Sequence, residues 1–199
     1  LQLASTEDIR ASSKTFPRNT AVGNDHIHPR HFSILSEECL TGFLALIRWV
    51  GSNYILPSKL KLLLVILLPK PTGGDRPIGL FPSAIRVWTR WLQPNYVAPW
   101  ENCEGKRHYF FGEENKSCES CVWIQATTAE YARAANKSFA ATLLDLEKAF
   151  EKVPRDAVVR AARRYRYSLT LLRLSLAAYR MVRAIGVQGL FSRLLFPAL

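Results

Sequence analysis

Cysteine is scarce in this chain, and the dipeptide Asp-Asp does not occur in it. Four cysteines among 199 residues are too few for a disulfide framework, so a reducing, intracellular compartment is favoured. The longest apolar run covers residues 62–69, well short of the roughly 20 residues that a membrane-spanning helix needs, so we expect no membrane partner. We expect no secretory signal peptide either, because residues 1–10 include Glu7 and Asp8 and have no apolar segment.

Acidic residues almost disappear from the last quarter of the chain. Residues 152–199 hold 10 Lys and Arg and a single acid, Asp156, so most of the net charge of +11 lies there. Such one-sided charge attracts polyanions and favours nucleic acid as a partner. A basic surface without a dedicated partner is the alternative. The candidate nucleic-acid-binding residues are Arg160, Arg163, Arg164, Arg173, Arg180 and Arg183.

The spacing of apolar residues and turn formers predicts a mixture of helices and strands. Helical periodicity predicts helices at residues 36–50, 82–92, 117–136, 154–166 and 169–183. Apolar, β-branched runs predict strands at residues 59–69, 76–80, 139–146 and 185–195. We expect residues 1–33 and 100–116 to be mostly loop, Gly51 to end the first helix, and Pro94 and Pro99 to end the second. Because helices and strands do not alternate regularly, the pattern predicts an α+β fold.

Asp145 is the first candidate for chemistry. It ends an apolar run and precedes a short acidic and apolar segment. A carboxylate at the end of a strand can hold Mg²⁺, which binds to one or two carboxylates together with substrate phosphates. Alternatively, Asp145 is the N-cap of a helix that starts at Leu146.

Lys70 and Arg76 flank a turn at residues 71–75 that contains Gly73 and Gly74. The pattern predicts an antiparallel hairpin over residues 59–80 with the glycines at its tip. Two cations at the base of such a turn can hold a triphosphate, Lys as a point charge and Arg as a fork. Ordinary surface charge is the alternative.

Cysteine and histidine also form a partial zinc pattern. Two cysteines at a spacing of Cys-x₂-Cys are half of a zinc site, and the second half is poorly matched. Idle thiols are the alternative. The four residues are Cys103, His108, Cys118 and Cys121.

In this order, several segments resemble the reverse transcriptases of non-LTR retrotransposons and group II introns. The similarity extends over roughly residues 20–195. Gly23 and Asp25, followed by Pro29, resemble an N-terminal "G-x-D-x-x-P" segment. Residues 67–78 resemble the "I-P-K-x-G-G-x-R-P-I" hairpin of the fingers, and Arg86-Val87 stands where that family has "R-V". Residues 144–150 are similar to polymerase motif A, "D-L-x-x-A-F-D".

The resemblance implies an incomplete right-hand polymerase fold that performs RNA-templated DNA synthesis by two-metal nucleotidyl transfer. Asp145 would be catalytic, and it would bind Mg²⁺ together with the backbone carbonyl of Leu146. Lys70 and Arg76 would hold the incoming nucleotide, and Phe150 would screen its sugar. The implied partners are an RNA template, a DNA primer and a deoxynucleoside triphosphate, and no small-molecule cofactor is implied. The family also implies that such a protein acts in the nucleus.

The resemblance also implies a partial domain. Its parts would be an extension at residues 1–19, fingers at 20–92, the start of the palm at 93–151, and basic helices and a strand at 152–199. The family's second acidic cluster, an aromatic-x-Asp-Asp hairpin, is missing, and no thumb is recognised. We therefore expect this chain to be inactive alone and, because its apolar residues 190–196 lack cover, poorly soluble. The alternatives are a degenerate, non-catalytic nucleic-acid-binding remnant and a zinc-linked interaction module.

Overall fold

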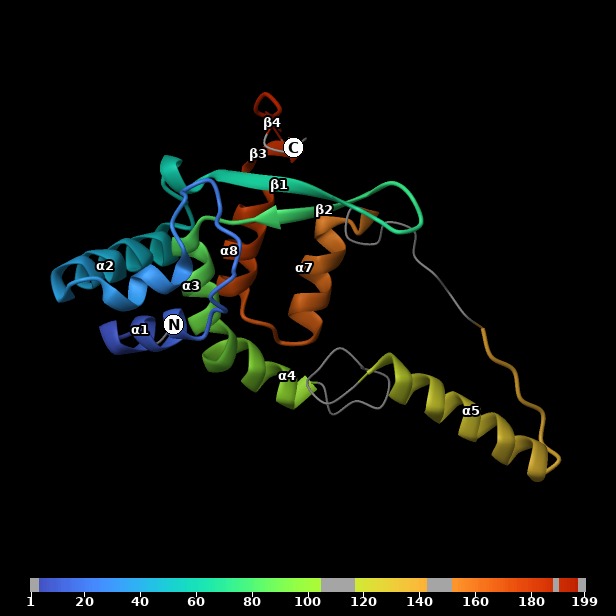
Figure 1. Cartoon of the computed structure of the whole chain (residues 1–199). Coiled ribbons are helices and arrows are strands. Elements are labelled where there is room, and N and C mark those ends of the chain that lie inside the picture. Colours follow the sequence, from blue (N-terminus) through green and yellow to red (C-terminus); the bar gives the residue numbers. More distant parts are fainter. Residues whose placement is uncertain (1–3, 105–116, 143–151, 188–189, 197–199) are drawn as a thin grey trace. The chain divides into compact units, whose positions relative to one another are not determined.

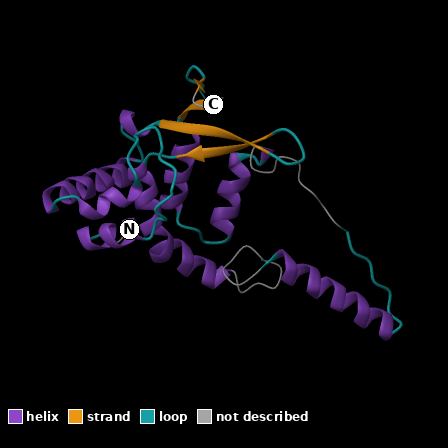
Figure 2. Cartoon of the chain, viewed as in Figure 1, coloured by secondary structure: helices purple, strands orange, loops and turns teal. Residues whose placement is uncertain are grey.

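The computed structural model describes residues 4–104, 117–142, 152–187 and 190–196 (Figure 1). These residues form two compact units, one within residues 1–95 and 168–199 and the other within residues 96–167. We call the first the sheet unit, because it contains every described strand, and the second the helical unit. In chain order the helical unit is an insertion within the sheet unit. Helices and strands occur together (Figure 2), which confirms the predicted α+β class.

The N-terminal region contains a helix, α1 (Thr6–Lys14), where the sequence predicts mostly loop. Ser5 and Asp8 form a capping box at its start. The Ser5 side chain accepts the Asp8 N–H at 3.1 Å, and the Asp8 carboxylate accepts the Ser5 N–H at 2.9 Å. The loop prediction is wrong because this local cap, together with complete burial of Ile9, stabilises a helix of modest propensity. A 3-10 helix, η1 (Pro29–Ile34), follows.

Helix α2 (Glu37–Asn53) begins as predicted, with Ser36 as its N-cap, but continues through Gly51, where the sequence predicts its end. It ends at Tyr54, whose φ of 57° is left-handed and whose N–H donates to the Val50 carbonyl at 2.8 Å. A glycine inside a helix costs only about 1 kcal/mol relative to alanine. The helix therefore ends where a residue takes the left-handed conformation, and not at the first glycine.

Strands β1 (Leu62–Pro69) and β2 (Asp75–Leu80) pair antiparallel, which confirms the predicted hairpin. Gly73 and Gly74 lie in its turn with φ of 87° and 76°, values that favour glycine. The Lys70 N–H donates to the Gly74 carbonyl at 2.9 Å, and the Gly73 N–H donates to the Lys70 carbonyl at 3.1 Å. These bonds close the turn, which Figure 1 shows at the end of the hairpin remote from α2.

The sheet has the strand order β2-β1-β3-β4. β3 (Val182–Val187) runs parallel to β1, and β4 (Leu190–Phe191) runs antiparallel to β3. The predicted helix at 169–183 is wrong at its end, because α8 (Leu169–Tyr179) stops and β3 begins at Val182. This boundary is set by the pairing of β3 with β1, which is far away in the sequence. The periodicity of the local sequence therefore does not predict it. The 3-10 turn η2 (Ser58–Leu60) precedes β1.

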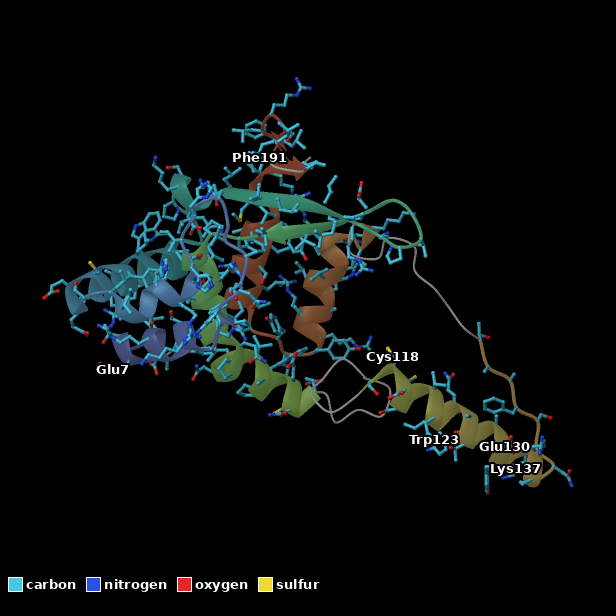
Figure 3. All side chains as sticks on the ribbon, viewed as in Figure 1. Glu7, Cys118, Trp123, Glu130, Lys137 and Phe191 are labelled. Carbon is cyan, nitrogen blue, oxygen red and sulfur yellow. The ribbon has the colours of Figure 1, made fainter. Side chains whose placement is uncertain are left out.

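The apolar residues that follow β3 are exposed. Phe191 on β4 is 60% exposed (Figure 3), and Leu190, Leu194 and Phe196 are exposed as well. A Cβ on Gly186 would lie 2.8 Å from the Phe191 ring, so the glycine leaves room for that ring over β3. The structure therefore leaves this run uncovered, and its effect on solubility stays a prediction.

Helix α3 (Ser83–Leu92) has the predicted bounds and forms the centre of the core. It packs against α1 and η1. Its buried apolar side chains are Ile85, Val87, Trp88, Trp91 and Leu92.

A π-helical segment, η3 (Gln93–Val97), and α4 (Ala98–Glu104) follow α3 directly in the sequence. α3 thus ends at Leu92, before Pro94, as predicted, but neither proline ends the helical course of the chain, which continues through η3 and α4. Pro99 is the second residue of α4, and proline is tolerated in the first turn of an α-helix. Pro94 lies within the π-helical turn, and the Asn95 side chain donates to a carbonyl of the last turn of α3 at 2.7 Å.

The helical unit contains α5 (Cys118–Ala134) and α7 (Arg155–Arg164), both predicted from the sequence. The indole N–H of Trp100 donates to the Tyr165 carbonyl at 2.7 Å, and its ring packs edge-on against Tyr167 at 4.9 Å. This cluster joins α4 to the chain that follows α7. Among the residues with described positions, no helix is long and apolar enough to cross a membrane.

The predicted strand at residues 139–146 is wrong in its described part, because residues 139–142 have no regular structure. A strand needs a neighbour for its backbone groups, and within the described ranges no strand pairs with these residues. The remainder of the predicted strand lies outside the described residues.

Candidate functional site

The proposed catalytic residues lie in the part of the chain that the structure leaves undescribed. Asp145, Leu146 and Phe150 fall within residues 143–151, outside the described residues. Their assigned roles, and the choice between metal ligand and helix cap for Asp145, stay predictions. The described candidates are therefore basic groups.

The hairpin presents two of these groups. Arg76 on β2 is the cross-strand partner of Leu68 on β1, and Lys70 follows Leu68 by two residues. Lys70 lies directly after β1, and its N–H donates to the carbonyl of Gly74, two residues before Arg76, so the two basic residues stand at the same end of the hairpin. Both are exposed, and neither forms an ion pair with a described residue. This arrangement leaves two cations free to bind an anion beside a glycine turn.

The segment before the hairpin is fixed to the start of α3. The Asp25 carboxylate accepts the Ser83 N–H at 2.6 Å, and the Ser83 hydroxyl donates to the Ile27 carbonyl. Asp25 thus caps a helix whose N-cap, Pro82, has no side chain able to do so. A Cβ on Gly23 would lie 2.6 Å from the Phe81 carbonyl oxygen. The two backbone segments can therefore lie this close only with glycine at position 23.

Arg86 strengthens the same junction. Its guanidinium donates to the Ala21 carbonyl at 2.5 Å and lies 5.6 Å from the centre of the Phe16 ring, which Arg90 also covers at 4.5 Å. Burial lowers the pKa of Arg86 from its ordinary value and the charge of Arg90 adds to this, whereas the charge of Asp25 opposes it. Within the described residues, Arg86 therefore acts as a structural clamp.

The arginines of α7 share one helix face. Arg160, Arg163 and Arg164 are spaced by three and four residues, and all are exposed. Arg160 forms an ion pair with Asp156, and its hydrogen bond lowers the pKa of that carboxyl. Arg163 and Arg164 have no ion-pair partner among the described residues, so they offer two unneutralised charges to a polyanion.

Arg173, Arg180 and Arg183 all fall within the helix predicted at residues 169–183, and this placement is wrong for Arg180 and Arg183. Arg173 is on α8, Arg180 caps its C-terminus, and Arg183 is half-buried in β3. The structure instead brings Arg173 and Arg180 to a pocket that is also lined by Lys61. Sequence reasoning missed Lys61, although a lysine directly before an apolar strand indicates a charge held at the strand's end.

The candidate zinc residues do not gather in the described part of the chain. Cys103 on α4 and Cys118 on α5 (Figure 3) are exposed free thiols, and Cys121 is partly exposed. His108 lies outside the described residues. Within the described ranges, no three residues of the types His, Cys, Asp or Glu come together as a metal site requires.

Comparison with known proteins adds no assignment to this geometry. No protein-family model matches the chain, and no characterised protein shows significant similarity to it in sequence. The likeness to reverse transcriptases therefore depends on the motifs quoted above, and the functional argument depends on the basic sites.

Proposed function

We propose that this chain is the fingers and the first part of the palm of an RNA-directed DNA polymerase of a mobile element. The observation that carries the proposal is the hairpin, in which a closed double-glycine turn stands beside two exposed cations without ion-pair partners. A triphosphate needs concentrated positive charge and donors that reach several oxygens, and this pair of side chains offers both.

The way the hairpin is anchored supports the proposal. β1 is the inner strand between β2 and β3, so hydrogen bonds hold it on both sides, and the glycine turn follows the last paired residues of β1 and β2. β2 leads through Phe81 directly into α3, whose start is capped by Asp25. A base that is paired in this way holds Lys70 and Arg76 at a set spacing, which favours binding of one anion by both side chains.

The proposal assigns the remaining roles by motif. Asp145 and the Leu146 carbonyl would be ligands of Mg²⁺, which supplies two-metal nucleotidyl transfer in a complete domain that also has the second acidic cluster. Phe150 screens the sugar of the nucleotide. The exposed arginines of α7 contact phosphates of the RNA template or DNA primer, and they contribute affinity without reading sequence.

The test is an equilibrium titration with a fluorescent, ribose-labelled dTTP analogue in the presence of Mg²⁺. Lys70→Ala and Arg76→Ala should each weaken binding roughly ten-fold or more, because a charge-assisted hydrogen bond contributes about 1.5–3 kcal/mol. Lys59→Ala is the matched control, since it removes another exposed positive charge, one that belongs to η2, which precedes β1. Equal affinities for the hairpin variants and the parent chain, or an equal loss in the control, would overturn the proposal.

The same titration separates a polymerase from a non-catalytic nucleic-acid-binding remnant. In a polymerase, Asp145→Ala should abolish the Mg²⁺-dependent part of dTTP binding and leave oligonucleotide binding nearly unchanged. In a remnant, nucleotide binding depends on neither Mg²⁺ nor Asp145. This second result would replace catalysis by binding as the function.

A further inference from the structure

A second basic site lies in the sheet unit, away from the hairpin turn. It is a pocket of about 430 Å³ bounded by the end of α2, the start of β1 and the C-terminal half of α8. This volume falls within the roughly 300–1,000 Å³ of ordinary small-ligand sites. Its basic side chains are Lys61, Arg173 and Arg180.

The charges of this pocket are uncompensated. Among the described residues, no acidic residue lines it, and none of its three basic side chains forms an ion pair there. Three cations from two separate parts of the chain repel one another, and an anion between them would relieve that repulsion. The rest of the lining is mainly apolar, with Leu56, Leu176 and Met181 among its members.

One wall of the pocket is aromatic. The guanidinium of Arg173 lies 5.1 Å from the centre of the Tyr54 ring, a cation–π contact. Tyr54 ends α2 with a φ of 57°, which is uncommon for a bulky residue. Glycine or asparagine suits that position better, so a tyrosine there indicates that the ring has a use of its own.

We propose that this pocket binds one nucleotide unit of a single-stranded nucleic acid. Its phosphate lies among Lys61, Arg173 and Arg180, and its base lies against Tyr54 and the apolar lining. Bases stack on aromatic rings and on guanidinium planes, and phosphates bind to Lys and Arg, so the lining matches both halves of a nucleotide. The choice of nucleic acid as the source of the phosphate rests on the proposed function.

The pocket is distinct from the triphosphate site of the hairpin. Lys61 directly precedes β1, and Lys70 directly follows it. At about 3.3 Å per residue the two lie roughly 30 Å apart along an extended strand. A single nucleotide cannot span that distance, so the pocket takes a different part of the substrate.

The experiment is an anisotropy titration of the full chain with a fluorescein-labelled octamer of thymidylate at several salt concentrations. Lys61→Ala, Arg173→Ala and Arg180→Ala should each weaken binding several-fold, and the triple variant should flatten the log–log salt dependence by about two units. Lys59→Ala, whose side chain is exposed and does not line the pocket, should change neither quantity. Unchanged affinity and salt dependence in the triple variant would overturn the proposal.

A second measurement tests the base. Tyr54→Gly removes the ring and suits the left-handed backbone, so the end of α2 is preserved. It should weaken binding of the thymidylate octamer but not of an abasic phosphodiester of equal length. An equal loss for both probes, or full competition by inorganic phosphate at equal phosphate concentration, would overturn the assignment to a nucleotide. If the pocket fails while the hairpin variants lose dTTP binding, the proposed function stands without it.

Discussion

Gly23 provides the sharpest test of the junction between residues 20–29 and α3. A Cβ at this position would lie 2.6 Å from the Phe81 carbonyl oxygen and 3.1 Å from its carbon. Both are backbone atoms, so no side chain can rotate away and the two segments must move apart. Overpacking of this kind costs about 1–3 kcal/mol.

The displacement would also strain the bonds that hold the junction. The short contact from Asp25 to the Ser83 N–H, at 2.6 Å, depends on the same approach. Losing one such bond would add about 1 kcal/mol. We therefore expect Gly23→Ala to lower the free energy of unfolding by about 2–4 kcal/mol, and 2 kcal/mol alone raises the unfolded fraction roughly thirty-fold.

The assay is urea denaturation followed by tryptophan fluorescence, since Trp88 and Trp91 are buried side chains of α3, the helix that begins at this junction. Gly42→Ala is the matched control. Gly42 is exposed inside α2, and a Cβ there would meet no side chain or other segment within 4 Å, so alanine should stabilise the chain by about 0.5–1 kcal/mol. If Gly23→Ala is as stable as the parent chain or shifts in the same direction as the control, the close approach is refuted.

Three further predictions concern single contacts. Asp25→Ala should lower the free energy of unfolding by about 1 kcal/mol in urea denaturation, because α3 loses its cap. Asp25→Asn keeps an oxygen acceptor and should lower the free energy of unfolding by less. Equal losses of stability in the two variants would contradict this. Ser13→Ala should cost about 1–3 kcal/mol in the same assay, since the buried Ser13 hydroxyl donates to the Pro29 carbonyl at 2.6 Å, and no loss would show that the bond contributes nothing. The pKa of Tyr167 is raised from its ordinary value of 10.0 by burial and then by the charge of Glu101. The folded chain thus keeps this proton when the unfolded chain loses it, so stability should fall above about pH 10. Tyr167→Phe should lose less stability than the parent chain over that range, and parallel curves would contradict the assignment.

Local signals in the sequence predicted much of the fold. The hairpin follows from two prolines and two glycines between apolar runs, because these residue types restrict the backbone without help from distant contacts. The start of α2 at Ser36 and that of α5 at Ser117 follow in the same way, since in each the serine side chain accepts an N–H of the first turn.

The failures occur where distant contacts decide. The end of α8 depends on the pairing of β3 with β1, which no local pattern reports. The failure at α1 has another cause, since the capping box of Ser5 and Asp8 is a local signal that marks the start of this helix. It was missed because a polar composition outweighed the capping box, and because the burial of Ile9 depends on partners elsewhere in the chain.

The basic residues of the two candidate sites also differ in whether a local sequence signal predicts them. Lys70 and Arg76 were found because one short motif contains both. The pocket was missed because Lys61 and the two arginines are far apart in the sequence, and only the parallel pairing of β1 with β3 brings the end of α8 to the start of β1. The motif comparison puts Arg86 in the helix after the hairpin, and Arg86 does lie in α3. Its hydrogen bond to the Ala21 carbonyl shows a structural role that the motif alone does not predict.

The pairing of β1 also determines how the two basic sites are related. β1 is held antiparallel to β2 and parallel to β3, so its register is fixed on both sides. A slip of one residue would turn every side chain of the strand to the other face, and it would move Lys61 away from the arginines of α8. The same slip would move Lys70 relative to Arg76. One strand register therefore maintains both basic sites at once. An oligonucleotide that bound to the pocket and to the hairpin together would have to span a fixed distance of about 30 Å.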